Sequence, residues 1–393
     1  MKLKIEEVYQ ELKKTNVVSN VGLLTGLSGQ IISLANYEKI IQIRSGCIVD
    51  FLEILEDKIT NESFVYSYCS GLAGIGWLYE YLKSCEFING DTNELLEDFD
   101  KPLEKALMID MAKWNYDFLH GGVGIALYFV KRILKNQNLF SVLNHFLDCL
   151  DKIKEYEKEN QFKWKSVIDI TTKETGYNIS MSHGSSSIVC LLAKMYQLDN
   201  NSLNKKLIKN LLNGAMEYII DQEIDRERYK CYFASMSIES DKILQQSRMG
   251  WCYGDLGIAT TLYQAGKALQ NQNWIDKSLE ILLYTAENRK SLEEGRVADA
   301  GLCHGTAGIG HIFYRAWWNT RMPEFKKASD YWFEQTLKMA KFEDGLAGFK
   351  TWYVEEGWIN NYSLLQGITG IGLALLTYYH EVEPTWDECL LLS

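Results

Sequence analysis

The stretch CHGTAGIGH, residues 303–311, decides the fold. It places a Gly-x-x-Gly-Ile pattern directly after a cysteine and a histidine, and small and apolar residues follow. The pattern recurs along the chain, which indicates an internal repeat. The seven copies begin at Gly26, Gly71, Gly121, Gly184, Gly254, Gly305 and Gly367. The fourth copy departs from the pattern because Ser187 stands in place of its second glycine.

Two kinds of segment alternate along the chain. Each copy opens a run that is apolar on most faces, which is typical of a buried helix. Amphipathic segments such as 141–159 and 274–290 lie between the copies. Each repeat is therefore expected to be one outer and one inner helix. The glycines at the start of the inner helix would allow close backbone approach and positive φ.

Seven such hairpins predict an all-α fold, an (α/α)7 toroid or barrel with small non-helical insertions. An open superhelix is the alternative. Segments 161–180 and 226–248 are the expected insertions, since they are irregular and the first is rich in β-branched and turn residues. Both could cover a cavity mouth. No linker rich in Ser, Gly or Pro divides the chain, so residues 1–393 are expected to form a single domain.

The composition narrows the class of protein. Only three prolines occur, which favours long helices. A net charge of −11 argues against a nucleic-acid partner, which needs a basic face. The nine dispersed cysteines indicate reduced thiols in a cytoplasmic protein. The N-terminus lacks the apolar core of a signal peptide, and no run reaches the ~18 apolar residues of a membrane span.

The two positions before each first glycine are expected to face the central cavity at one end of the toroid. These fourteen positions hold three of the six histidines and three of the nine cysteines in the chain. The pairs are Leu24-Thr25, Cys69-Ser70, Leu119-His120, Ser182-His183, Cys252-Tyr253, Cys303-His304 and Leu365-Gln366. Groups able to bind metals or transfer protons would therefore gather at one end.

The candidate zinc ligands are Cys252, Cys303 and His304. They occupy the positions just before the first glycine in two consecutive repeats. Two thiolates and an imidazole suit Zn²⁺, and three protein ligands leave the open position of a catalytic site. The alternative is two buried thiols and a core histidine. Cys69 has the same phase but lies three repeats away, so it is excluded as a ligand. The other six cysteines are expected to pack in the core.

Five further residues are candidates for chemistry. His183, in the repeat before Cys252's, could be a general acid or base, or a hydrogen-bonded histidine at a helix entry. His120 could do similar work. Asp117 could orient a histidine or cap a helix. Arg248 could stabilise an anion or be solvated, and Tyr253 could donate a hydrogen bond or form a wall.

Along essentially its whole length the chain resembles the lanthionine synthetase C-like family, the cyclases of lanthipeptide biosynthesis. The resemblance rests on the seven glycine motifs, SHG at 182–184, WCYG at 251–254, CHG at 303–305 and the tail 386–392. It implies an α/α toroid that adds peptide cysteine thiols to dehydroalanine or dehydrobutyrine. The products would be lanthionine and methyllanthionine rings.

The resemblance also implies roles for particular residues. One zinc ion would be held by Cys252, Cys303 and His304. His183 would be the catalytic histidine, and the other active-site positions would be Asp117, Arg248 and Tyr253. His120 and Ser187 depart from the pattern of the family. The chemistry fits these residues, since a metal deprotonates a thiol whose pKa is otherwise ~8.5. His183 could then protonate the enolate, and Arg248 could stabilise its oxygen.

The expected function is therefore a standalone, zinc-dependent lanthipeptide cyclase in the cytoplasm, with association with a membrane-bound complex as an option. The chain has no room for a dehydratase domain. The expected partners are a dehydrated precursor peptide, a separate dehydratase and an export transporter. One alternative is the addition of glutathione to dehydroamino acids in damaged proteins, and another is a peptide-binding scaffold with structural zinc. A glycosidase is disfavoured because Asp117 and Asp255 form no clear pair.

Overall fold

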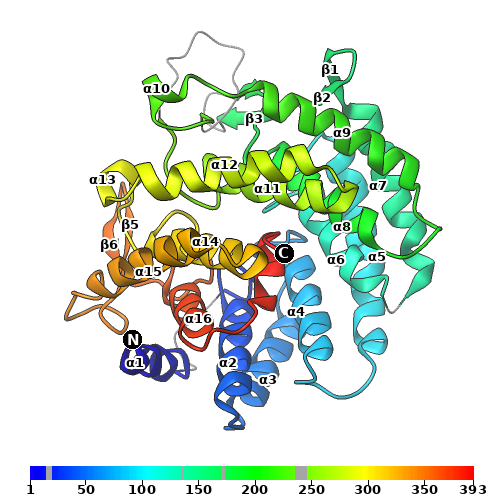
Figure 1. Ribbon diagram of the computed structural model, residues 1–393. Coiled ribbons are helices and arrows are strands. Elements are labelled where there is room, and N and C mark those ends of the chain that lie inside the picture. Colours follow the sequence, from blue (N-terminus) through cyan, green and yellow to red (C-terminus); the bar gives the residue numbers. More distant parts are fainter. Residues whose placement is uncertain (15–19, 135, 170–172, 235–245) are drawn as a thin grey trace. The chain divides into compact units, whose positions relative to one another are not determined.

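A computed structural model describes residues 1–14, 20–134, 136–169, 173–234 and 246–393. The chain is mainly helical (Figure 1). It divides into two compact units. Unit 1 comprises Met1–Thr92 and Leu292–Leu392, and unit 2 comprises Asn93–Ser291, with Ser393 assigned to it. Within the described residues, no helix is long and apolar enough to cross a membrane.

The predicted alternation of inner and outer helices is confirmed. All seven first glycines are N-caps of inner helices. The inner helices are α2 (Leu27–Ile41), α4 (Leu72–Ser84), α6 (Gly122–Arg132), α8 (Ser185–Gln197), α11 (Asp255–Leu269), α14 (Thr306–Thr320) and α16 (Ile368–Tyr379). The outer helices are α1 (Lys2–Leu12), α3 (Cys47–Asn61), α5 (Thr92–Ala112), α7 (Phe140–Ile153), α9 (Lys205–Asp221), α12 (Gln272–Asn288) and α15 (Pro323–Lys338). The short helices are α10 (Arg226–Tyr229), α13 (Leu292–Gly295), η1 (Gln137–Leu139) and η2 (Thr385–Leu390).

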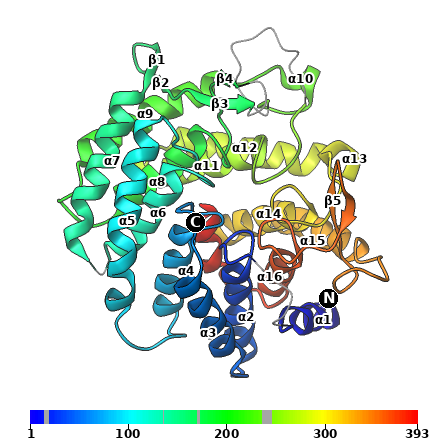
Figure 2. The same cartoon turned by 180° about the vertical axis from the view of Figure 1, so that it is seen from behind.

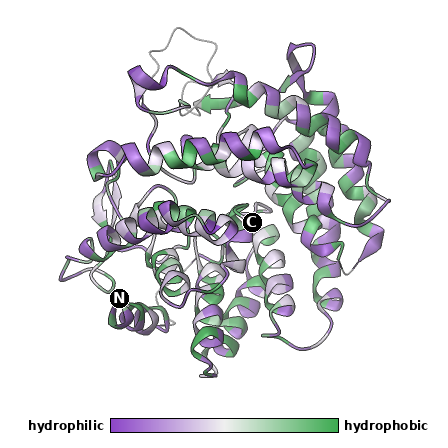
Figure 3. Ribbon diagram, in the orientation of Figure 1, coloured by the Kyte–Doolittle hydropathy of each residue, from purple (hydrophilic) through white to green (hydrophobic). Residues whose placement is uncertain are grey.

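Burial separates the two kinds of helix. The outer helix α12 buries Trp274, Ser278, Ile281, Leu282 and Thr285, which recur at the spacing of one helix face. Figure 3 accordingly shows hydrophilic and hydrophobic residues in turn along α12. The inner helix α14 buries every residue from Thr306 to Ala316. The inner helices therefore form the core, as their apolar composition predicts.

Close backbone approach explains the repeated glycines. A Cβ on Gly308 would lie 1.9 Å from the carbonyl oxygen of Leu302, and one on Gly26 would lie 2.0 Å from that of Asn20. The expected positive φ is found at only one of the seven first glycines, Gly254, at +85°. That expectation is wrong for the other six, which have negative φ and need glycine for space. In the fourth copy, the Ser187 hydroxyl donates to the Gly184 carbonyl at 2.8 Å.

In unit 1, the turns of adjacent repeats are joined by backbone hydrogen bonds. The Leu24 N–H donates to Cys69 O at 2.9 Å, and the Leu365 N–H donates to Leu24 O at 3.0 Å. The Cys303 N–H donates to Leu365 O at 2.8 Å. The last repeat thus packs on the first, and α16 lies against α1 and α2 (Figure 1). An open superhelix would hold these repeats apart, so that alternative is excluded.

Unit 2 carries the insertion expected at 161–180, but it begins earlier, because α7 ends at Ile153 and the first strand starts at Glu155. Two antiparallel hairpins, β1 (Glu155–Lys158) with β2 (Gln161–Lys163) and β3 (Ser166–Asp169) with β4 (Glu174–Gly176), precede α8. Figure 2 shows β1 and β2 beside α9, which β2 contacts. Of the second expected insertion, 226–248, the first part is helix α10, and residues 235–245 lie outside the described residues.

A third hairpin, β5 (Thr351–Tyr353) with β6 (Gly357–Ile359), lies in unit 1 and was not expected. Its sequence, TWYVEEGWI at 351–359, is rich in β-branched and aromatic residues on both sides of a turn that contains glycine. Gly357 has φ +74° in that turn, a conformation that glycine adopts at little cost. The pattern was therefore a detectable hairpin signal.

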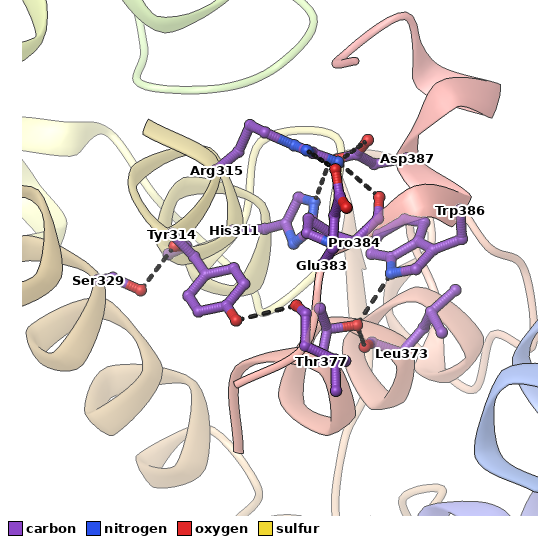
Figure 4. A network of polar contacts seen from close by, with 12 residues as sticks. His311, Tyr314, Arg315, Ser329, Leu373, Thr377, Glu383, Pro384, Trp386 and Asp387 are labelled. Carbon is purple, nitrogen blue, oxygen red and sulfur yellow. Dashed lines mark hydrogen bonds and ion pairs between the residues drawn. The ribbon is translucent and has the colours of Figure 1, made fainter. Parts of the chain in front are cut away.

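The C-terminal η2 is fixed to α14 by a buried polar network (Figure 4). The Arg315 guanidinium donates to Asp387 Oδ1 at 2.7 Å and to Oδ2 at 2.9 Å. His311 Nε2 lies 2.9 Å from the same carboxylate, and the Trp386 indole donates to Thr377 Oγ1 at 2.9 Å. Asp387 is completely buried, so these contacts satisfy a carboxylate that bulk solvent does not reach.

Candidate active site

The turns before the first glycines share a side-chain cap that sequence reasoning missed. An Asn or Asp stands six residues before the glycine in five repeats, at Asn20, Asn115, Asn178, Asp299 and Asn361. In four of these repeats its Oδ1 accepts the backbone N–H two residues on, at 2.7–3.0 Å. Alignment of the repeats by their glycines would have found this signal. Arg248 takes the same position in the fifth repeat, where it cannot accept such a bond.

A second cap stands four residues before the glycine. The hydroxyls of Ser180 and Ser363 each accept a backbone N–H three residues on, at 3.2 Å. In the third repeat Asp117 performs this function, and its Oδ1 accepts the His120 N–H at 2.8 Å. Because a carboxylate has a second oxygen, Asp117 can cap its turn and still contact another side chain.

That second oxygen contacts His183. Asp117 Oδ2 lies 2.5 Å from His183 Nδ1, so the turns of the third and fourth repeats meet through these side chains. The contact occupies Nδ1 and leaves Nε2 as the nitrogen that can exchange a proton with a substrate. Asp117 thus contacts both the backbone of the turn before α6 and a histidine side chain.

The surroundings of His183 favour the protonated ring. Burial lowers the pKa of His183, but the hydrogen bond and the charge of Asp117 raise it more, with a further contribution from Cys252. The net pKa lies above the ordinary value of 6.5. A larger share of the ring is therefore imidazolium near neutral pH, which is the form that a general acid needs.

Cys252 and Tyr253 lie beside the His183 turn within unit 2. The carbonyl oxygen of Cys252 accepts the Met181 N–H at 3.2 Å and the Ser182 hydroxyl at 3.3 Å. The ring of Tyr253 lies 6.2 Å from that of His183. Burial, followed by the charge of Cys252, raises the pKa of Tyr253, so this phenol remains a hydrogen-bond donor at neutral pH.

His183 and Tyr253 border a cavity of about 420 Å³, here called the His183 cavity. Its wall includes Asp117, His183 and Tyr253 from the repeated turns, together with His120. It is completed by the segment after α5, by strand β3 and by the segment before α8, which contribute Lys113, Trp114, Asn115, Tyr116, Ser166, Val167, Ile168 and Asn178. The volume lies in the range of ~300–1,000 Å³ that is typical of small-ligand sites. The expected insertion thus contributes part of the wall.

Cys303 and His304 lie in unit 1, at the turn that enters α14. Cys303 is buried and His304 is half-buried. Asp299 holds this turn, because its Oδ1 accepts the Gly301 N–H at 3.0 Å and its Oδ2 accepts the Trp352 N–H at 3.0 Å. Cys303 precedes α14 as Cys252 precedes α11, so each thiol lies at the positive end of a helix dipole, which stabilises a thiolate.

The other sequence candidates are placed as follows. Arg248 and His120 are exposed, and only His120 borders the His183 cavity. Cys69 is buried in unit 1, where its carbonyl accepts the Leu24 N–H. Of the six cysteines expected to pack, four are buried and two, Cys85 and Cys149, are half-buried.

Comparison with known proteins gives three findings. The nisin biosynthesis protein NisC of Lactococcus lactis subsp. lactis is 24% identical over 407 residues, which cover 94% of this chain and 88% of that protein. The solved structure of a nisin cyclase matches with a TM-score of 0.73 at 20% identity, covering 100% of this chain and 97% of the other. The likeness to that helical toroid confirms the expected fold class. The family model for lanthionine synthetase C-like proteins matches residues 5–391, and the chain therefore belongs to the lanthionine synthetase C-like family.

Proposed function

We propose that this protein is a zinc-dependent peptide cyclase. It adds cysteine thiols to dehydroalanine or dehydrobutyrine in a lanthipeptide precursor and so forms lanthionine and methyllanthionine rings. The observation that carries the proposal is the His183–Asp117 pair in the wall of a ligand-sized cavity. Membership of the family and the likeness to a nisin cyclase support the same reaction.

The proposed zinc ligands are Cys252, Cys303 and His304, the candidate metal-binding group of the described residues. The donor chemistry fits, because two thiols and one imidazole are ligands that Zn²⁺ prefers. Both thiols are buried beside a helix N-terminus, where their negative charge is favoured. Zinc, when bound, would bind the substrate thiol in its deprotonated form. We propose that residues 1–393 work as one domain, because no linker rich in Ser, Gly or Pro divides the chain.

The protein's own residues supply the remaining steps. Attack of the thiolate on the β-carbon produces an enolate, which must gain a proton at its α-carbon. His183 delivers this proton from Nε2, while Asp117 holds Nδ1 and keeps the ring protonated. Arg248 stabilises the enolate oxygen, and Tyr253 donates a hydrogen bond into the site. Since Arg248 replaces the turn-capping Asn or Asp of other repeats, the turn itself does not require it.

The chemistry of the proposed substrate indicates which partners the protein needs. A peptide that already carries dehydroamino acids requires a separate dehydratase. We propose that enzyme, the dehydrated precursor and an export transporter as the partners of this protein, in the cytoplasm or in a membrane-associated complex.

Substitution of two cysteines that occupy the same position in their repeats tests the proposal. We expect Cys303→Ala to lose bound zinc and ring closure on a peptide with one dehydroalanine and one cysteine, because it removes a ligand. Cys69→Ala is the matched control, since Cys69 is also a buried thiol two residues before a first glycine. It should retain about one zinc and normal ring closure. Metal analysis and mass spectrometry would contradict the proposal if both variants behaved like the wild type.

A further inference from the structure

Trp114 is an unusual residue in the wall of the His183 cavity. It is a large aromatic side chain with 57% of its surface exposed. Helix α5 ends just before it, and the Asn115 N–H donates to Asp110 O at 2.9 Å, which closes the helix end. Trp114 takes the left-handed conformation in this turn, with φ +60°. Glycine is the usual residue at such a position.

The protein tolerates left-handed residues at other helix ends, but with different side chains. Gln270 follows α11 with φ +56°, and Arg321 follows α14 with φ +59°. Among the described non-glycine residues with positive φ, Trp114 is the one aromatic residue. A bulky side chain in this conformation is strained, and an indole that is more than half exposed gains only part of the free energy of burial. Trp114 is therefore poorly suited to its position as far as the fold is concerned.

The cavity supplies a reason for this residue. Val167 on β3 borders the same cavity and is also 57% exposed, so two elements present apolar surface to it. The charged groups of the wall have both signs, as Lys113, Asp117 and His183 illustrate, and do not select a charged ligand group. An apolar group that covers Trp114 and Val167 removes both from water, which is favourable.

We propose that Trp114 and Val167 form a substrate subsite that binds an apolar side chain next to the reacting dehydroamino acid. This inference rests on the proposed function for the identity of the ligand as a peptide. His183 must reach the α-carbon of the dehydroamino acid to protonate it. The neighbouring residue of the peptide is then held in the same cavity, against the end of α5 and β3.

Binding and turnover measurements test this subsite together. Two dye-labelled peptides carry one dehydroalanine and one cysteine, and differ only in the residue next to dehydroalanine, which is Leu or Asn. We expect the wild type to bind the Leu peptide about three- to tenfold more tightly, the size of an aromatic contact. Trp114→Gly should lose this preference in Kd and KM with kcat nearly unchanged, whereas Trp114→Phe should keep most of it.

The glycine variant also separates binding from folding. Trp114→Gly relieves the left-handed strain, so its Tm should equal or exceed that of the wild type. Gln270→Gly is the matched control, because it relieves the same strain at an exposed helix end outside the cavity wall. It should keep the preference for Leu.

Three outcomes overturn the subsite: no binding of either peptide, no preference in the wild type, or a preference that survives in Trp114→Gly. Preferential binding that depends on Trp114 but leads to no ring closure would support the subsite and contradict the proposed function. Ring closure without a preference for the Leu peptide would support the proposed function and contradict the subsite.

Discussion

At the scale of single residues, Asp117 shows how one carboxylate can hold its own turn and also contact the proposed catalytic histidine. One oxygen caps the His120 N–H, a bond that Ser180 and Ser363 make in other repeats, and the other oxygen holds His183. Serine can replace the first contact but not the second. The Asp117→Ser variant therefore separates the contact within the turn from the proposed catalytic contact with His183.

We expect Asp117→Ser to fold with a stability within about 1 kcal/mol of the wild type. Its His183 should have a lower pKa, because the hydrogen bond and charge that raise this pKa are gone while burial, which lowers it, remains. Imidazolium is lost as pH rises through the pKa of His183. The alkaline fall of kcat/KM should accordingly move to lower pH, and ring closure should slow by up to about 100-fold. An unchanged pH profile would remove Asp117 from the mechanism.

At the scale of elements, η2 depends on one buried carboxylate. Burial raises the pKa of Asp387, but the charge of Arg315 and the contact with His311 outweigh it and hold this pKa at about 2. The folded pKa is lower than the ordinary 3.8, so this stabilisation is present above pH 3.8 and is lost as pH falls toward 2.

We expect Asp387→Asn to lower the free energy of unfolding by about 3–5 kcal/mol, because it removes the buried carboxylate that pairs with the buried Arg315 charge. Glu383→Gln is the control. Glu383 lies 3.7 Å from Arg315 but is 57% exposed, so its loss should cost less than about 1 kcal/mol. Urea unfolding measures both. Equal effects of the two variants would show that the buried network of Figure 4 does not hold η2.

At the scale of the whole molecule, the repeat made most of the fold predictable. The positions of the repeated glycines predict the starts of all seven inner helices, and the expected toroid fold is confirmed. The bond between Asp117 and His183 could not be predicted, because it depends on how two turns 66 residues apart meet. The strained backbone of Trp114 left no signal either, since tryptophan is not typical of a left-handed position. The β5–β6 hairpin and the Asn caps did leave signals.

The most direct test of the central claim is the product formed from a peptide that carries one dehydroalanine and one cysteine. The peptide is incubated with the zinc-loaded protein and excess glutathione, then treated with iodoacetamide and analysed by mass spectrometry. We expect a product of unchanged mass that resists alkylation, because ring closure consumes the thiol without adding atoms. A glutathione adduct, or a peptide that is still fully alkylated, would contradict the assignment of this protein as a lanthipeptide cyclase.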